Sequence, residues 1–224
     1  MLQITEKLRA AYPGARVGAI LFKKVQVSEA GEADLRAIKK ELEANLRHKY
    51  GDLSRSDLIL TEPLKSYVDY YKSFKKTYHV LLQLESVIFK NRSIPKINPL
   101  VLIMFMAELK NLLLTAAHDF DSISLPISVD LSKGSESYTL LNGMEKELPS
   151  GDMMMGDKEG IISSIIYGPD YRSRINEKTS SALYTVYAPP GIEEAFIIEH
   201  LNDIRHYMSI VSPQAEMEKM MVMM

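Results

Sequence analysis

Hydrophobic residues three and four positions apart predict a series of helices in the first half of the chain. The spacing is regular in residues 34–48, 66–76 and 78–90, and each of these segments is expected to be helical. Residues 53–63 lack the pattern and are expected to form a loop. The first half is therefore predicted to be mainly α-helical.

The second half follows a different pattern, in which short β-branched or alternating apolar runs are separated by turn residues. Together with a strand or strand pair at 15–27 and an amphipathic helix at 193–210, it predicts an α+β fold with a mixed or antiparallel sheet packed with helices. We expect a single domain over 1–212. The methionine-rich tail, 213–224, is expected either to be disordered or to form a soft contact surface. The expected strands are 126–131, 138–141, 161–167 and 182–188.

The most apolar stretch runs from Lys96 to Ile123 and ends in the polar cluster His118-Asp119-Phe120-Asp121. Asn98 is expected to cap a helix whose first turn contains Pro99 and which runs to Ala116 or Ala117. A membrane span is disfavoured because Glu108, Lys110 and two asparagines interrupt the run. We expect a buried helix that delivers His118 at its end.

Composition narrows the classes of partner. The chain has 224 residues, a net charge of −2 and no cysteine. A protein without a basic field is not expected to coat DNA, although a local contact with one tRNA end remains compatible. The lack of cysteine excludes disulfides, thiol nucleophiles and cysteine-bound zinc, and fits a reducing compartment. No basic-then-apolar leader opens the sequence, and we expect a cytoplasmic protein without a membrane partner.

No Gly-rich phosphate loop, nucleophile elbow or HExxH motif occurs. His118 with Asp119 and Asp121 lacks a second histidine at helical spacing, so no metal ion or cofactor is predicted. Three segments each leave two interpretations open. The tyrosines and lysines of 66–76 could pack in the core or bind RNA. Glu136, in the 133–137 loop, could be solvated or line a pocket mouth, and Gly168 could serve a turn or a ligand that approaches the backbone closely.

Taken in order, these motifs resemble the B3/B4 domain of the phenylalanyl-tRNA synthetase β subunit. The resemblance rests on Asn98-Pro99, the apolar run and the His118–Asp121 cluster, then on Leu141-Asn142-Gly143 and the strand that ends at Gly168. The helical segment 67–95 is similar to that of free-standing members of the family. The resemblance covers residues 10–212.

The resemblance implies an editing domain that hydrolyses the ester of a mischarged tRNA in trans, with the tRNA acceptor end and an aminoacyl group as partners. By position, His118 would be catalytic, and Asn98, Glu136, Gly168 and Thr185 would contact the substrate. Thr185 stands where the family has a glutamate. Whether the chain is an enzyme is therefore left open, and the alternative is a non-catalytic module that binds an amino acid or similar small molecule. Aminoacylation by this chain alone is not expected.

Overall fold

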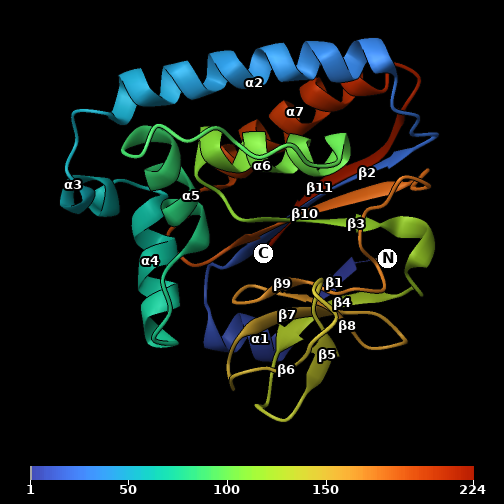
Figure 1. Cartoon of the computed structure of the whole chain (residues 1–224). Helices are drawn as coiled ribbons and strands as arrows, with labels where there is room; N and C mark the ends of the chain where they lie inside the picture. The colour runs from blue at the N-terminus through green and yellow to red at the C-terminus, as the bar shows by residue number, and fades with distance from the viewer. Residues whose placement is uncertain (1) are drawn as a thin grey trace.

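Two β-sheets face each other at the centre of the molecule (Figure 1). The computed structural model describes residues 2–224. One sheet is antiparallel and has the strand order β11-β2-β10-β3, so β3 and β11 form its two edges. Its strands are β2 (Arg16–Lys23), β3 (Thr115–Asp119), β10 (Ala182–Ala188) and β11 (Glu216–Met223).

The second sheet is mixed and has the order β1-β4-β7-β8-β9. Only β1 and β4 pair in parallel, and the other neighbours are antiparallel. The hairpin β5–β6 (Ser137–Thr139, Glu145–Glu147) projects below it, and α1 (Glu6–Ala11) lies beside it (Figure 1). The strands of this sheet are β1 (Leu2–Ile4), β4 (Ile127–Leu131), β7 (Met153–Gly156), β8 (Ile161–Ser164) and β9 (Gly168–Pro169).

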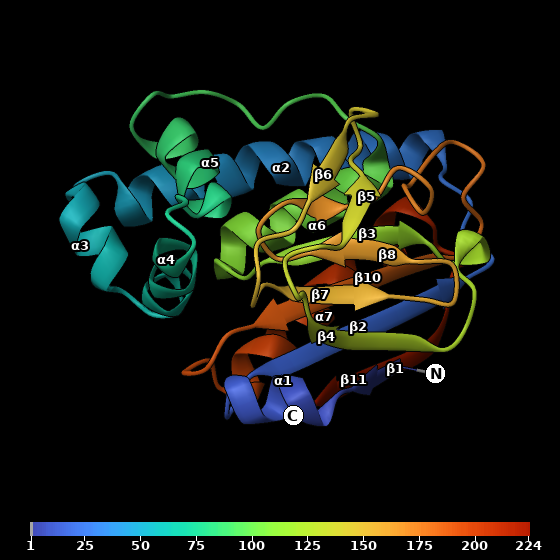
Figure 2. The ribbon, with the colours of Figure 1, turned by 90° about the horizontal axis from the view of Figure 1, so that it is seen from below.

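Helices cover the outer face of the four-stranded sheet and one end of the molecule (Figures 1 and 2). On the sheet, Gly18 leaves room for α7, because a Cβ there would lie 2.4 Å from Ile197 Cγ2. The helices α6 (Pro99–Asn111) and α7 (Glu194–Val211) lie on the sheet, α2 (Glu29–Tyr50) crosses them, and α3 (Arg55–Leu60), α4 (Leu64–Ser73) and α5 (His79–Ile88) close the end.

The predicted α+β fold is confirmed, and the helices predicted within 34–48, 66–76, 78–90 and 193–210 are all present. The run 15–27 forms one strand, β2, rather than a pair. The four strands expected in the second half also form, with shorter bounds in three of them. Strand β8, for example, ends at Ser164 because residues 165–167 form a turn.

The predicted length of the central helix is wrong, and so is the expectation that His118 lies at its end. Helix α6 stops at Asn111 because Leu112 adopts a left-handed conformation, with φ +61°, and donates its N–H to the Glu108 carbonyl. The apolar run then continues as β3, which carries His118. A helix and a strand that are both buried give the same unbroken apolar run, so periodicity did not separate them.

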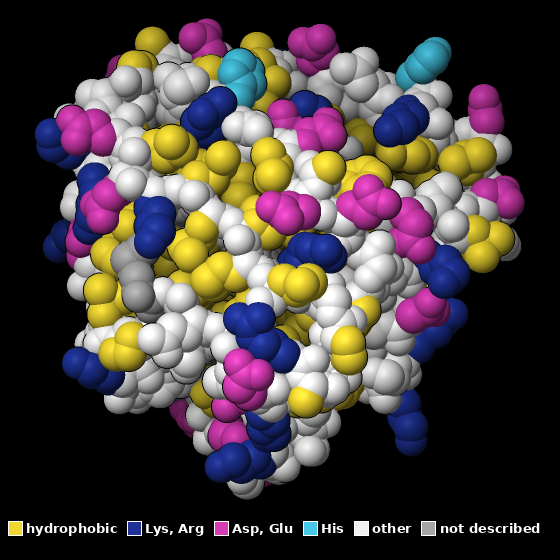
Figure 3. Space-filling model, turned by 180° about the vertical axis from the view of Figure 1, so that it is seen from behind, with side chains coloured by type: hydrophobic (Ala, Val, Ile, Leu, Met, Phe, Trp, Pro, Cys, Tyr) yellow, Lys and Arg dark blue, Asp and Glu magenta, His cyan; other side chains and the backbone are white. Residues whose placement is uncertain are grey.

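Two other segments differ from the expectations. The predicted loop 53–63 contains the short helix α3, whose start is fixed by a reciprocal pair of hydrogen bonds between Ser54 and Asp57. Residues 216–223, for which disorder or a contact surface was expected, form β11 and pair with β2. The methionines of this strand are partly exposed, and Figure 3 shows hydrophobic side chains gathered on the rear face of the molecule. Within residues 2–224, no helix is long and apolar enough to cross a bilayer.

Candidate functional site

A cavity of about 650 Å³ lies along the edge of β3 that does not face β10, between this strand, α5, α6 and the loop after β8. We call it the β3-edge cavity. An apolar cavity of this size with a few polar groups is typical of small-molecule sites. The apolar side chains of its wall include Val101, Met104, Phe105, Leu114, Ile166 and Ile175, and its polar ones are His79, Gln83, Glu108, Thr115, Ser164, Tyr167, Arg174 and Tyr187.

The edge of β3 supplies backbone groups to the cavity. The Thr115 N–H points away from β10, because it donates to Glu108 Oε1 at 2.8 Å. Backbone groups alternate along an antiparallel strand, which places the Ala117 N–H on the same edge. Ala117 lines the cavity. A ligand in the cavity can therefore meet a backbone hydrogen-bond donor.

Two tyrosines of α4 fix the cavity wall. The Tyr67 hydroxyl donates to the Tyr187 carbonyl at 2.6 Å and accepts the Leu114 N–H at 3.0 Å, which joins β10 to the start of β3. The Tyr71 hydroxyl donates to the Ile165 carbonyl at 2.6 Å. Burial raises the pKa of both hydroxyls, so they keep their protons. The aromatic residues of this helix thus pack in the core, which was the first of the two interpretations of 66–76.

Glu108 is a carboxyl group inside the cavity wall. Its side chain is buried, and burial raises its pKa to about 8, although the hydrogen bond from Thr115 opposes the shift. The bond to Thr115 occupies Oε1. No side chain or backbone group of residues 2–224 bonds to Oε2. At pH 7, Glu108 is therefore mainly protonated.

His79 and Gln83 lie one turn apart on α5 and line the same cavity. The Tyr71 hydroxyl already donates its hydrogen to the Ile165 carbonyl. In the 3.0 Å contact between Tyr71 Oη and His79 Nδ1, the histidine N–H is therefore the donor. Burial lowers the pKa of His79 to about 4, which keeps the ring neutral with Nε2 as an acceptor. Gln83 Oε1 is buried and has no hydrogen-bond partner among the described residues.

Two residues that line the cavity, Tyr167 and Arg174, contact further basic and aromatic side chains, and we call this group of five residues the rim. Lys146 Nζ lies 4.7 Å and Lys76 Nζ 5.7 Å from the centre of the Tyr167 ring. The Arg174 guanidinium stacks 3.6 Å from the centre of the Tyr171 ring, which is exposed at the surface. Rings and cations in this arrangement can stack bases and neutralise phosphates.

Gly168 lines the cavity beside Tyr167 and has φ +80°, a conformation that favours glycine. The Tyr138 hydroxyl donates to its carbonyl oxygen at 2.7 Å and fixes the direction of this peptide. No atom within 4 Å would meet a Cβ at this position. The glycine is therefore required by the backbone conformation of the wall.

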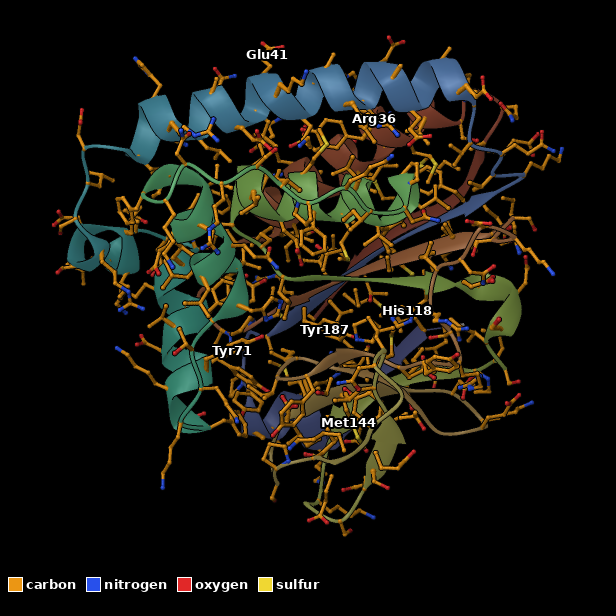
Figure 4. The ribbon with its side chains drawn as sticks, in the orientation of Figure 1. Arg36, Glu41, Tyr71, His118, Met144 and Tyr187 are labelled. Carbon is orange, nitrogen blue, oxygen red and sulfur yellow. The ribbon has the colours of Figure 1, made fainter. Side chains whose placement is uncertain are left out.

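His118 lies behind the cavity, between the two sheets (Figure 4), and is fully buried. The Ser173 hydroxyl donates its single hydrogen to Asp170. In the 2.7 Å contact between Ser173 Oγ and His118 Nδ1, the histidine N–H is therefore the donor. This leaves Nε2 as the acceptor, and it has no partner within residues 2–224. Burial, aided by the charge of Arg172, lowers the pKa of His118 to about 3. The ring is neutral at pH 7.

A family model described as B3/4 domain matches residues 66–195, more than half of the chain. The chain belongs to the B3/4 domain family. The match spans every residue that lines the β3-edge cavity.

One solved structure similar to this B3/4 protein is an N-terminal fragment of the phenylalanyl-tRNA synthetase β-subunit from Pyrococcus horikoshii. The alignment has a TM-score of 0.54 and 11% sequence identity, and it covers 100% of this chain but only 54% of that fragment. At this identity the likeness concerns the fold alone. No curated protein matches the chain by sequence.

In the B3/4 fold, Thr185 lies on β10 opposite Ala116 and faces the same side as His118 and Tyr187. Its side chain is fully buried, and its Oγ1 has no hydrogen-bond partner among residues 2–224. The Tyr187 hydroxyl lies nearby. Two buried acceptors, on His118 and Thr185, thus face the space between the sheets. Of the predicted site residues, only Gly168 itself lines the cavity.

Asn98 and Glu136 lie apart from this cavity. Asn98 caps α6 through a 2.9 Å hydrogen bond to the Leu100 N–H, as predicted, and borders a separate hollow with Thr179. Glu136 accepts the N–H groups of Lys133 and Gly134, and these bonds keep the pKa of its carboxyl low. The cavity wall therefore does not join His118, Glu136 and Gly168.

Three polar groups of the cavity escaped the sequence analysis: His79, Gln83 and Glu108. The signal for Glu108 was present, since it is an acidic residue that follows nine consecutive apolar positions in α6, Pro99–Ala107. His79 and Gln83 carried no distinguishing signal, because polar residues on an amphipathic helix are normally solvated.

Proposed function

We propose that this B3/4 domain binds the aminoacyl end of a tRNA in the β3-edge cavity and hydrolyses the ester of a wrongly attached amino acid in trans. The observation that carries the proposal is the cavity itself. It is large enough for an amino acid, it is mainly apolar, and two of its lining residues belong to the rim of tyrosine, lysine and arginine.

The reaction needs a held water, a donor for the developing oxyanion and a place for the leaving ribose hydroxyl. The Ala117 N–H on the β3 edge is suited to the oxyanion. His118, with its neutral ring and its unpartnered Nε2, is suited to orient the attacking water if that water reaches the space behind Ala116 and Ala117. Glu108 and Gly168 then belong to the aminoacyl pocket.

The rim suits the nucleic-acid part of this substrate. Tyr167 and Tyr171 offer faces on which a terminal base can stack, and Lys76, Lys146 and Arg174 can neutralise adjacent phosphates. A local rim of this kind is compatible with the overall net charge of −2. The proposal therefore places the ribose and the terminal phosphates at the cavity mouth.

A deacylation assay with a panel of aminoacyl-tRNAs tests the proposal. We expect at least one charged tRNA to lose its amino acid faster than in buffer, and His118→Ala to slow that reaction. His206→Ala, a change on the exposed face of α7, should not. If no member of the panel is cleaved above background, the hydrolase proposal is wrong.

A second candidate is a binding module that captures an amino acid or similar small molecule without chemistry. Two observations favour it: Thr185 brings no carboxylate to the site, and His118 is fully buried. In that case free amino acids should raise the melting temperature, while charged tRNA should remain intact. Cleavage of charged tRNA would exclude this candidate.

A further inference from the structure

We propose that Glu108, Gln83 and His79 form the subsite that receives the α-ammonium group of the ligand, while the apolar wall receives an uncharged side chain. This assignment rests on the proposed function insofar as the ligand is an amino acid or aminoacyl group. It names the side chains that would bind the α-ammonium group. Neither the sequence motifs nor the family match assigns this role to any residue.

The three side chains offer acceptors. Gln83 Oε1 is buried without a partner. His79 uses Nδ1–H for Tyr71, which leaves its Nε2 lone pair. Glu108 uses Oε1 for Thr115 and leaves Oε2. An ammonium group has three N–H donors and no acceptor, so it complements this set.

Charge selects an ammonium over a neutral donor. An ionised carboxylate buried without a partner is costly, and Glu108 is therefore mainly protonated at pH 7. A cation placed beside Oε2 removes that cost and leaves an ion pair. Tyr67, Tyr71 and Tyr78 are the tyrosines near enough to be affected by the charge of Glu108, and burial keeps all three protonated. His79 and Arg174 line the same cavity; the histidine is neutral, and the arginine stacks on the exposed ring of Tyr171.

The rest of the cavity wall determines which class of ligand side chain the cavity prefers. Val101, Met104, Phe105, Ile166 and Ile175 provide no hydrogen-bonding side-chain group. A charged side chain placed against them would lose its hydration without compensation. The cavity should therefore prefer aliphatic or aromatic amino acids over acidic ones.

The test compares matched ligands by isothermal titration calorimetry at pH 6.5. The probes are leucinamide and phenylalaninamide, which mimic the ester, and the corresponding amides that lack the α-amino group. We expect the amino amides to bind at least tenfold more tightly than their partners. Binding should release close to one proton per ligand, measured by repeating the titration in buffers of different ionisation enthalpy, because Glu108 must ionise.

Three variants separate recognition from folding. Glu108→Gln keeps an oxygen for the Thr115 N–H, and it should weaken amino-amide binding at least tenfold and abolish proton release. Gln83→Met should weaken binding while raising the melting temperature, because it removes a buried unpartnered oxygen; a purely structural role would not give that combination. Glu41→Gln, an exposed change on α2 (Figure 4), should have no effect.

The assignment is overturned if Glu108→Gln binds the amino amides as the wild type does, or if amides lacking the amino group bind equally well. In either case a wild-type protein that still cleaves charged tRNA leaves the proposed function standing. A wild type that binds none of the amides and cleaves no charged tRNA overturns both.

Discussion

His118 Nδ1 lies 2.7 Å from Ser173 Oγ, and the serine hydroxyl in turn donates to Asp170. This relay fixes the tautomer of a histidine that has no contact with solvent. A histidine held neutral in the folded state couples stability to pH, because the unfolded chain can bind a proton that the folded chain refuses.

The pKa of His118 is about 3 in the folded protein against an ordinary value of 6.5. The contribution of His118 to the free energy of unfolding is therefore fully present above pH 6.5. It is lost as the pH drops from 6.5 towards 3, and the loss at pH 5 is about 2 kcal/mol. His118→Gln should lower stability at pH 7 but flatten this decline. Urea unfolding at pH 5 and pH 7 measures both effects. His206→Gln, on the exposed face of α7, is the control, and an equally steep decline in the His118 variant would contradict the argument.

Glu108 should have the opposite dependence. Its folded pKa of about 8 lies above the ordinary value of 4.5, so the buried carboxyl lowers the stability of the fold increasingly as the pH rises from 4.5 to 8. Relative to the wild type, Glu108→Gln should gain on the order of 3 kcal/mol between pH 5 and pH 8. Thermal melts at the two pH values test this, with Glu41→Gln as the matched control. A constant difference between variant and wild type would show that Glu108 ionises freely in the folded state.

Tyr67 joins β3 and β10 through one hydroxyl. Tyr67→Phe leaves the Leu114 N–H and the Tyr187 carbonyl without this partner, although the Tyr187 N–H still reaches the Leu114 carbonyl at 3.2 Å. Each buried polar group left unpaired costs about 1–3 kcal/mol, and we expect a loss of at least 2 kcal/mol in the free energy of unfolding. Tyr171→Phe, at an exposed ring, should change it little. A small effect at Tyr67 would mean that water replaces the hydroxyl.

The rim lysines should contribute electrostatic affinity for RNA. The double variant Lys76→Ala with Lys146→Ala should bind tRNA about tenfold more weakly and lower the salt dependence of binding, with the slope of log affinity against log salt smaller by about 1.5 for the two lost phosphate contacts. Lys40→Ala with Lys219→Ala removes the same charge from exposed positions on α2 and β11. If both pairs weaken binding alike, tRNA does not use the rim.

Pairing of β11 with β2 is expected to protect the edge of the four-stranded sheet. Adjacent N–H groups alternate in direction along a strand, so prolines at Met221 and Val222 must together remove a ladder hydrogen bond. The double variant should melt at a lower temperature and self-associate through the uncovered β2 edge, as measured by light scattering. Glu218→Pro is the matched control because it falls at the bulge between Met217 and Lys219. Equal behaviour of the two variants would mean that β11 contributes little.

The class of fold was predictable because most elements carry a clear period, as β4 and α7 do. The central run was not, since Leu112–Ala117 is buried throughout and its apolar run fits a helix and a strand equally. The site was harder still. Gly168 could be placed from its turn, but the cavity depends on which helix faces the edge of β3, and no local signal at His79 or Gln83 reports that tertiary contact.

The strand order also bears on how the chain reaches its native state. Ala19, near the start, pairs with Thr185 on one side and with Met221 on the other. Strand β2 therefore has no partner in its sheet until β10 has been synthesised, and contacts this far apart in sequence form slowly because a long loop must close first. We expect the central sheet to assemble late and slowly, after the local contacts of α3, α4 and α5 have formed.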